Sequence, residues 1–252
     1  MTENTTPVPA WVAGGLGQAL GDIPLGHSQP ALVADLSPGG PHLFNGTATL
    51  VELGSKKLAI TCHHVLQKYV ELRNAGRLAL FQIGKAVLDP VSQLIASDSK
   101  TDLAIIGLSA EQIITLEKGS EARFLVPPRW PPNPVKEGDF VSLGGYPGSF
   151  RKVISWDTLD FTSYSVGATP VSTVSETSIG CRFERDRWVW TDKRPGLVDP
   201  KELGGLSGAP AFVLREIHWE LAGIIFEFSE DFDIMFLRPA SVIGLDGSIR
   251  PL

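Results

Sequence analysis

The sequence predicts an all-β protein with two blocks of strands, and three observations support this fold class. Short apolar stretches with β-branched residues recur along the chain, and Gly, Asn, Asp and Ser lie between many of them, which is typical of antiparallel β domains. Helical patterns are sparse, and none is long. A proline-rich segment separates the strands into an earlier and a later group. We therefore expect two β-rich domains joined by a stiff connector.

The chain begins with a segment that has no clear periodicity. Residues 1–40 are rich in Pro, Gly and small residues, and we expect them to form an N-terminal extension. The first β block follows at 41–125. Within it we expect strands at Thr47–Leu53, Lys57–Thr61, Leu78–Ile83, Ala86–Leu88 and Leu103–Leu108, and short helical turns at Leu66–Arg73 and Ala110–Leu116.

The connector is predicted at 126–137. The ten residues Val126–Val135 include five prolines. Because proline fixes φ and lacks a backbone donor, a central strand or a helix is excluded there. The second β block occupies 138–252, and its expected strands are Phe140–Leu143, Lys152–Trp156, Ser178–Phe183, Ala211–Leu214, Glu220–Phe226 and Ile234–Leu237.

Composition narrows the class of protein. The 252 residues are 43% hydrophobic and 20% charged, which suits one large globular domain or two small ones folded against each other. The net charge of −6 and the lack of a basic run argue against nucleic acid as a partner. No apolar stretch approaches the roughly 18 residues of a membrane span, and the first residues do not resemble a signal peptide. We expect a cytoplasmic protein in which Cys62 and Cys181 are reduced thiols.

Three short segments carry the residue types of nucleophilic catalysis. They are Thr-Cys-His-His-Val at 61–65, Thr-Asp-Leu-Ala-Ile at 101–105 and Gly-Leu-Ser-Gly-Ala-Pro at 205–210. A serine hydroxyl becomes an effective nucleophile only when an imidazole takes its proton, and a carboxylate must hold that imidazole in the correct tautomer. The segments supply one candidate for each role.

The three segments, in this order, resemble the motifs of the trypsin/chymotrypsin-like serine peptidases, including their HtrA-like relatives, over roughly residues 40–240. The resemblance implies two six-stranded antiparallel β-barrels with the catalytic groups in the cleft between them. It makes His64 the general base, Asp102 the group that orients it and Ser207 the nucleophile, and it requires no metal or organic cofactor. The amides of Gly205 and Ser207 would form the oxyanion hole. The order His, Asp, Ser also excludes the α/β-hydrolases and the subtilisin-like enzymes.

Each assignment has an alternative. His63 could be the base instead of His64, or the two histidines could be purely structural. A metal half-site is disfavoured because no second Cys/His cluster follows. Asp98 competes with Asp102, but it lacks a following apolar strand. The turn Gly-Gly-Tyr-Pro-Gly at 144–148 is similar to one that opens the second barrel of bacterial relatives, and it could equally be a generic turn.

The chain departs from the family around its expected substrate site. Leu206 occupies the position where zymogen-activated members have an aspartate, so that activation switch is absent. Phe226 replaces a small polar residue that supports the catalytic aspartate in many relatives, and Phe228 replaces a glycine that often leaves the specificity pocket open. A substrate could still pair its backbone with residues 226–228. We expect Lys201, Phe226, Glu227 and Phe228 to contact substrate.

These patterns predict a serine endopeptidase that hydrolyses peptide bonds in protein substrates through an acyl-enzyme intermediate. Its partners would be a protein or peptide substrate and a regulatory protein, which the lack of a zymogen switch would require. The alternative is a catalytically silent module with the same fold, in which the phenylalanines fill the pocket and a peptide docks without being cleaved.

Overall fold

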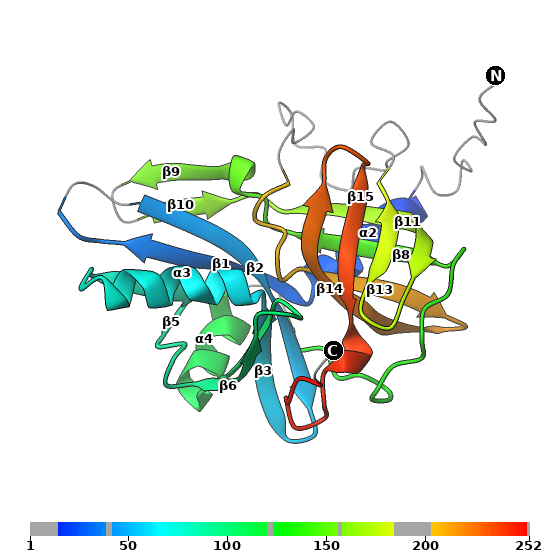
Figure 1. Cartoon of the computed structure of the whole chain (residues 1–252), viewed down its shortest axis with the longest axis horizontal. Helices are drawn as coiled ribbons and strands as arrows, with labels where there is room; N and C mark the ends of the chain where they lie inside the picture. The colour runs from blue at the N-terminus through cyan, green and yellow to red at the C-terminus, as the bar shows by residue number, and fades with distance from the viewer. Residues whose placement is uncertain (1–14, 39–41, 120–122, 156–157, 184–202, 251–252) are drawn as a thin grey trace.

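The computed structural model describes residues 15–38, 42–119, 123–155, 158–183 and 203–250, and it shows two β-rich halves packed together (Figure 1). The predicted mainly β class is therefore confirmed. The described helices are α2 (Gly15–Leu25), α3 (His63–Asn74) and α4 (Ala110–Gly119), with two 3-10 turns, η1 (Gly148–Phe150) and η3 (Ala240–Val242).

The first half is an antiparallel sheet of seven strands that curls into a half-barrel, which is consistent with the predicted double barrel although it has one strand more than expected. Its strand order is β5-β4-β1-β2-β3-β7-β6. Helix α3 contacts β1 and β4, and α4 contacts β5. The strands are β1 (Ser28–Asp35), β2 (His42–Leu53), β3 (Lys56–Thr61), β4 (Ala79–Ile83), β5 (Ala86–Leu88), β6 (Leu94–Asp98) and β7 (Leu103–Gly107).

The second half is a closed barrel of six strands, as predicted, in the order β11-β12-β15-β14-β13-β8. A separate two-stranded hairpin, β9 with β10, extends beside the first half (Figure 1). The strands are β8 (Phe140–Gly145), β9 (Arg151–Ser155), β10 (Thr158–Phe161), β11 (Tyr164–Val174), β12 (Ile179–Arg182), β13 (Pro210–Arg215), β14 (His218–Ser229) and β15 (Ile234–Pro239).

The N-terminal boundary of the first block was placed too late. Residues 28–35 belong to the predicted extension, yet they form β1, which pairs with β2 on one side and β4 on the other. Helix α2, also in the predicted extension, packs on β11 and β8 of the barrel. Gly167 permits this contact, because a Cβ there would lie 2.5 Å from the Gly17 carbonyl oxygen.

A shared apolar core joins the two halves. One cluster of buried side chains combines Leu58 and Ile105 of the first sheet with Phe212 and Ile224 of the barrel. The connector lies against this region, where Asn133 donates to the buried carboxylate of Glu220 through its backbone and side-chain nitrogens, at 2.8 and 2.9 Å. No helix or strand covers 126–139. The halves are thus fixed to each other by burial as well as by the chain.

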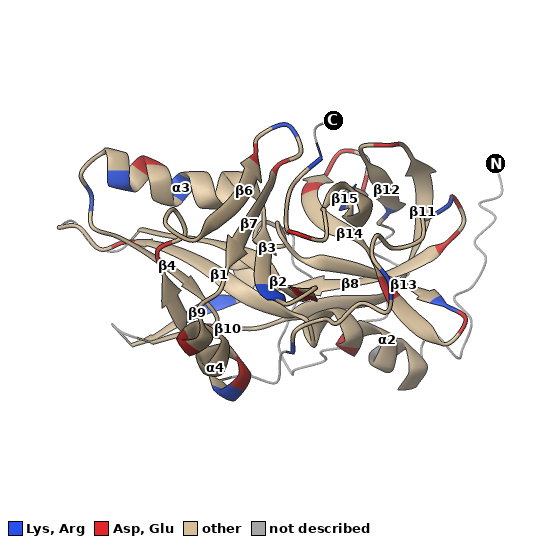
Figure 2. Cartoon of the chain, turned by 90° about the horizontal axis from the view of Figure 1, so that it is seen from below, with Lys and Arg blue, Asp and Glu red and all other residues tan. Residues whose placement is uncertain are grey.

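The charged surface agrees with a protein of mixed charge. Figure 2 shows basic and acidic residues interspersed along α3, α4 and the surrounding turns. Among the helices of the described residues, none has the length and apolar character needed to cross a membrane.

Candidate active site

His64 and Asp102 form a hydrogen-bonded pair. The imidazole Nδ1 lies 2.7 Å from Asp102 Oδ2, and the His64 backbone N–H donates to Asp102 Oδ1 at 3.0 Å. The His63 N–H donates to the Asp102 carbonyl at 3.2 Å, so two of the first amides of α3 are satisfied by one residue. The N-terminal end of a helix also favours a negative charge. The carboxylate is therefore held by the helix that carries the imidazole.

The turn before β7 presents Asp102 in an uncommon backbone conformation. Its φ of 53° is in the left-handed region, which costs a non-glycine residue about 1–2 kcal/mol. Asp98 supports the turn by accepting the Thr101 N–H at 2.8 Å, and this backbone hydrogen bond lowers the Asp98 pKa. Of the two competing aspartates, Asp102 contacts the imidazole, whereas Asp98 forms the turn.

The two histidines occupy different environments. His63 Nδ1 lies 2.7 Å from the Ser97 hydroxyl, which itself donates to the Leu103 carbonyl. The side chain of His64 is 52% exposed, while that of its partner Asp102 is 21% exposed. Both residues begin α3 rather than ending a strand, because their amides are capped by Asp102. The structure thus pairs His64, not His63, with a carboxylate.

Hydrogen bonds from strand β2 hold the glycine-rich turn of Ser207 in place. The Thr47 backbone N–H donates to the Ser207 carbonyl at 2.8 Å. The Thr47 hydroxyl donates to the Gly205 carbonyl at 2.8 Å and accepts the Tyr146 N–H at 3.0 Å. Two positions along β2, the Thr49 hydroxyl donates to the Gly208 carbonyl at 2.8 Å. Thr47 and Thr49 are fully buried, so these bonds fix the turn in a place without competing water.

Gly205 occupies a conformation that only glycine adopts comfortably. Its φ is 104°, and an added Cβ would lie within 2.7 Å of three atoms of Asn45, Tyr146 and Gly148. The carbonyl of Gly204 accepts the Gly148 N–H at 2.7 Å. In a trans peptide the C=O and the following N–H point in opposite directions. The Gly205 N–H therefore points away from Gly148.

The Ile225 carbonyl joins the histidine segment to the serine turn. It accepts the Gly208 N–H at 2.8 Å and the Cys62 thiol at 3.3 Å. Gly46 lies between the two segments, since a Cβ there would contact the Val65 side chain and the Ser207 carbonyl oxygen. The described residues include no hydrogen bond from Ser207 Oγ to His64, a contact that is often long in ligand-free enzymes. The structure thus unites His64 with Asp102 and brings their segment against the turn that carries Ser207.

One group of potential metal ligands occurs among the described residues. Cys62, His64 and Asp102 offer ligand atoms within 4.8 Å of one another. Complete burial raises the pKa of the Cys62 thiol well above its ordinary value, and the thiol is engaged with Ile225. A zinc ligand must be the thiolate, which this environment disfavours. The group is therefore a poor fit to a metal ion.

The predicted substrate-contacting residues are only partly described. Lys201 lies outside the described residues. The ring of Phe228 packs at 5.1 Å from that of buried Phe183, and Phe226 lies 6.4 Å from Phe236. Glu227 between them is exposed. Pairing of β13 with β14 ends at Pro210 and Ile224, so the edge of β14 beyond Ile225 is not paired by β13.

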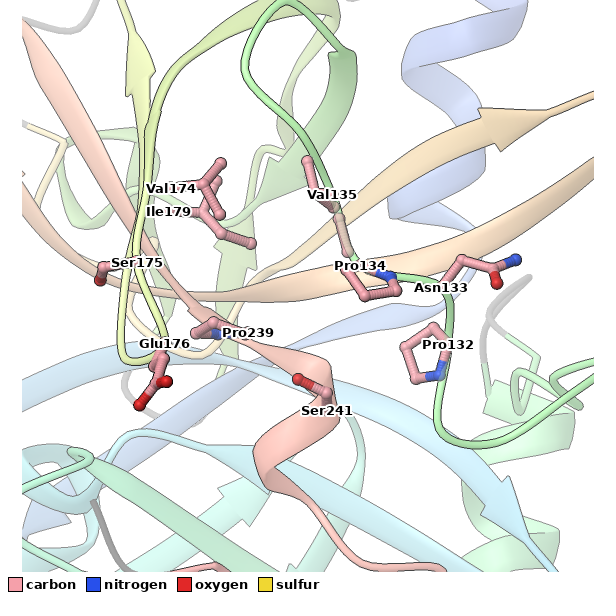
Figure 3. Close-up of a pocket in the computed structure, with 11 residues that line it drawn as sticks. Pro132, Asn133, Pro134, Val135, Val174, Ser175, Glu176, Ile179, Pro239 and Ser241 are labelled. Atoms are coloured by element: carbon pink, nitrogen blue, oxygen red, sulfur yellow. The ribbon is translucent and has the colours of Figure 1, made fainter.

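Leu206 lies between the two candidate oxyanion donors and is 1% exposed, within the apolar core of the barrel. A carboxylate would be out of place there. The sequence reasoning missed Thr47 and Thr49, whose only signal was their position on an apolar strand. A separate pocket between the connector and the barrel includes none of the predicted site residues; Figure 3 labels Pro132, Asn133, Pro134, Val135, Val174, Ser175, Glu176, Ile179, Pro239 and Ser241 around it.

The solved structures that are similar to the chain include three proteases. The active form of the Rv3671c protease from M. tuberculosis is 17% identical with a TM-score of 0.41, and the match covers 93% of this chain and 83% of that one. A thermostable serine protease, AL20, from an extremophilic microorganism is 15% identical with a TM-score of 0.45, covering 84% and 90%. A mutant of the Tobacco Etch Virus protease is 11% identical with a TM-score of 0.46, covering 83% and 72%. No protein-family model and no curated protein matches.

Proposed function

We propose that this chain is a serine endopeptidase of the trypsin-like kind. The observation that carries the proposal is the 2.7 Å bond between His64 Nδ1 and Asp102, on a helix whose segment packs against the turn of Ser207. This bond leaves Nε2 as the imidazole nitrogen available to receive a proton. A serine in a glycine-rich turn is the nucleophile that this arrangement would serve.

The proposed reaction divides amide hydrolysis into two steps. His64 takes the Ser207 proton as Oγ attacks the scissile carbonyl carbon, and the resulting imidazolium gives that proton to the leaving amine. Water then attacks the acyl-enzyme with His64 again as the base, which releases the carboxylic acid and restores the serine. The amides of Gly205 and Ser207 would stabilise the oxyanion in both steps, and one such donor is typically worth about 3–4 kcal/mol.

A fluorophosphonate probe tests the nucleophile. We expect the wild-type chain to be labelled and Ser207→Ala to be unlabelled, with a loss of up to about 10⁶-fold in kcat on a cleavable substrate. The adjacent histidines provide a matched pair: His64→Ala should abolish labelling, whereas His63→Ala should retain most of it. Labelling of the Ser207→Ala variant at the wild-type rate would refute the assignment.

The second candidate function is a catalytically silent peptide-binding module. It is favoured by Phe228, whose ring packs against that of Phe183 at a position where a small residue would leave the specificity pocket open. Incubation with casein and with a peptide library distinguishes the two functions. Binding without cleavage by a folded sample that is also unlabelled by the probe would favour the silent module.

We further propose that a partner protein regulates the enzyme. The proposal is supported by Leu206, because a buried leucine cannot form the ion pair of a zymogen switch. Isolated chain whose specific activity equals that in cell extract would contradict it.

A further inference from the structure

A buried arginine on β15 lies behind the turn that carries Asp102. Arg238 is 6% exposed, and all three guanidinium nitrogens donate to backbone carbonyls. Nε donates to Thr101 at 2.7 Å, Nη2 to Lys100 at 3.4 Å and Nη1 to Thr177. Two of these carbonyls belong to the two residues that immediately precede Asp102. Arg238 of the barrel is therefore hydrogen-bonded to the Asp102 turn, which belongs to the other half.

The Thr101 carbonyl belongs to the same peptide unit as the Asp102 N–H. Because that peptide is planar, fixing its oxygen fixes the direction in which the chain enters Asp102. Asp102 needs such support, because its φ of 53° is unfavourable for a non-glycine residue and persists only where the surrounding structure fixes it. A planar guanidinium with several donors can hold adjacent carbonyls in one geometry, which a lysine cannot.

The guanidinium is also a buried positive charge close to the candidate triad. Burial lowers the pKa of the Arg238 guanidinium, and the Asp102 carboxylate makes the largest contribution in the opposite direction, ahead of Asp98 and Glu227. The Phe226 ring covers it, with the guanidinium carbon 4.2 Å from the ring centroid, a cation–π contact that also shields the charge from water. Phe226 thus supports Asp102 indirectly, through the arginine, since a phenyl ring has no hydrogen-bonding atom to offer the carboxylate.

We propose that Arg238 is a positioning residue that orients the Asp102 carboxylate toward His64 Nδ1. It does so by fixing the Thr101–Asp102 peptide and by placing a buried positive charge behind the pair. This inference rests on the proposed function for the catalytic role of His64 and Asp102, but the geometry of the pair can be measured without substrate turnover.

The test compares Arg238→Met with a control arginine. Arg215 of β13 donates to the Pro134 carbonyl at 3.1 Å and to Asp139 at 2.8 Å, so Arg215→Met also removes an arginine that ties a loop to the barrel, but one that does not contact the Asp102 turn. The readout is the far-downfield proton resonance of His64 Nδ1–H bonded to a carboxylate, in protein whose folding is checked by circular dichroism. We expect Arg238→Met to lose or broaden it and Arg215→Met to retain it.

Kinetics give an independent readout. Alteration of the catalytic aspartate itself costs about 10⁴-fold in kcat, because the imidazole loses its correct orientation. Arg238→Met should only displace the Asp102 carboxylate, so we expect a loss of about 10²-fold in kcat with KM nearly unchanged. If Arg238→Met does not fold, Arg238→Lys keeps the charge but cannot bond three carbonyls, and the resonance should still weaken.

The outcomes separate the two proposals. A folded Arg238→Met or Arg238→Lys variant that retains the resonance and the wild-type kcat overturns the role of Arg238. Absence of the resonance from the wild-type protein overturns it as well. A wild-type resonance that Arg238→Met abolishes, in a protein without peptidase activity, supports the positioning role and rejects the endopeptidase.

Discussion

Replacing Thr47 with valine should separate the geometry of the serine turn from the presence of the catalytic groups. Valine has nearly the shape of threonine, so Thr47→Val removes the hydroxyl without opening a cavity. Two hydrogen bonds are lost, the one to the Gly205 carbonyl at 2.8 Å and the one from the Tyr146 N–H at 3.0 Å. The backbone bond from Thr47 to Ser207 remains.

The expected magnitudes follow from burial. A buried polar group left without a partner costs about 1–3 kcal/mol, so two such groups should lower the free energy of unfolding by about 2–6 kcal/mol. The Gly205 carbonyl and the Leu206 N–H form one peptide unit between the Gly205 and Ser207 amides, so rotation of the freed carbonyl would misdirect these adjacent amides. Removal of a whole oxyanion donor costs about 10²–10³-fold, so misdirecting one should slow the reaction by about 10- to 100-fold.

Thr49→Val is the matched control. The Thr49 hydroxyl, on the same strand and equally buried, bonds the Gly208 carbonyl on the other side of Ser207. Its loss should destabilise the protein by about 1–3 kcal/mol while leaving the Gly205 peptide in place. Rates of fluorophosphonate labelling and chemical denaturation measure the two effects. The reasoning fails if Thr47→Val reacts at the wild-type rate, or if Thr49→Val slows labelling as much as Thr47→Val does.

Two further predictions concern ionisable groups. Hydrogen bonding to Arg215 lowers the pKa of Asp139 below its ordinary 3.8. The Asp139 carboxylate therefore stabilises the fold at neutral pH, and this contribution is lost as the pH falls from 3.8 through the lowered value. Asp139→Asn should flatten the acid side of a stability–pH curve measured by denaturant unfolding, and an unchanged slope would contradict the pairing. Burial raises the pKa of Cys181 to about 12 and that of Cys62 well above its ordinary value, so a thiol reagent should modify neither in the native protein and both in denaturant, whereas rapid native labelling of either would contradict its burial.

Local motifs were the predictable part of the site. The segment around Ser207 requires φ values that only glycine tolerates, and the predicted turn is present because Gly205 and Gly208 have φ of 104° and 94°. The strand before His64 and the helical turn after it were also located, as β3 and the start of α3. Such features depend on neighbours in sequence. The catalytic roles themselves, and those of Gly205 and Ser207 as oxyanion donors, stay predictions until they are tested.

Strands that contain proline were missed. Pro30 lies in β1, within the predicted N-terminal extension, and Pro170 lies in β11, where no strand was predicted. Opposite Pro30, the Thr47 N–H and C=O face away, toward the Ser207 carbonyl and the Thr61 hydroxyl. Pairing with Thr47 therefore requires no backbone N–H from Pro30, and the proline removes no hydrogen bond between β1 and β2 at this position. Pairing of this kind depends on tertiary partners, which local propensity cannot reveal.

Several of the contacts that shape the candidate site cross from one half of the molecule to the other. Thr47 and Thr49 of the first sheet hold carbonyls of the serine turn, whereas Cys62 bonds Ile225 and Arg238 of the barrel holds Thr101. Each donor is buried, so displacement of one half would leave several polar groups without partners, at about 1–3 kcal/mol each. The same displacement would open the apolar cluster shared by both halves. The register of the site is therefore enforced by the interface on which the fold itself depends, and weakening that interface should reduce activity before the chain unfolds.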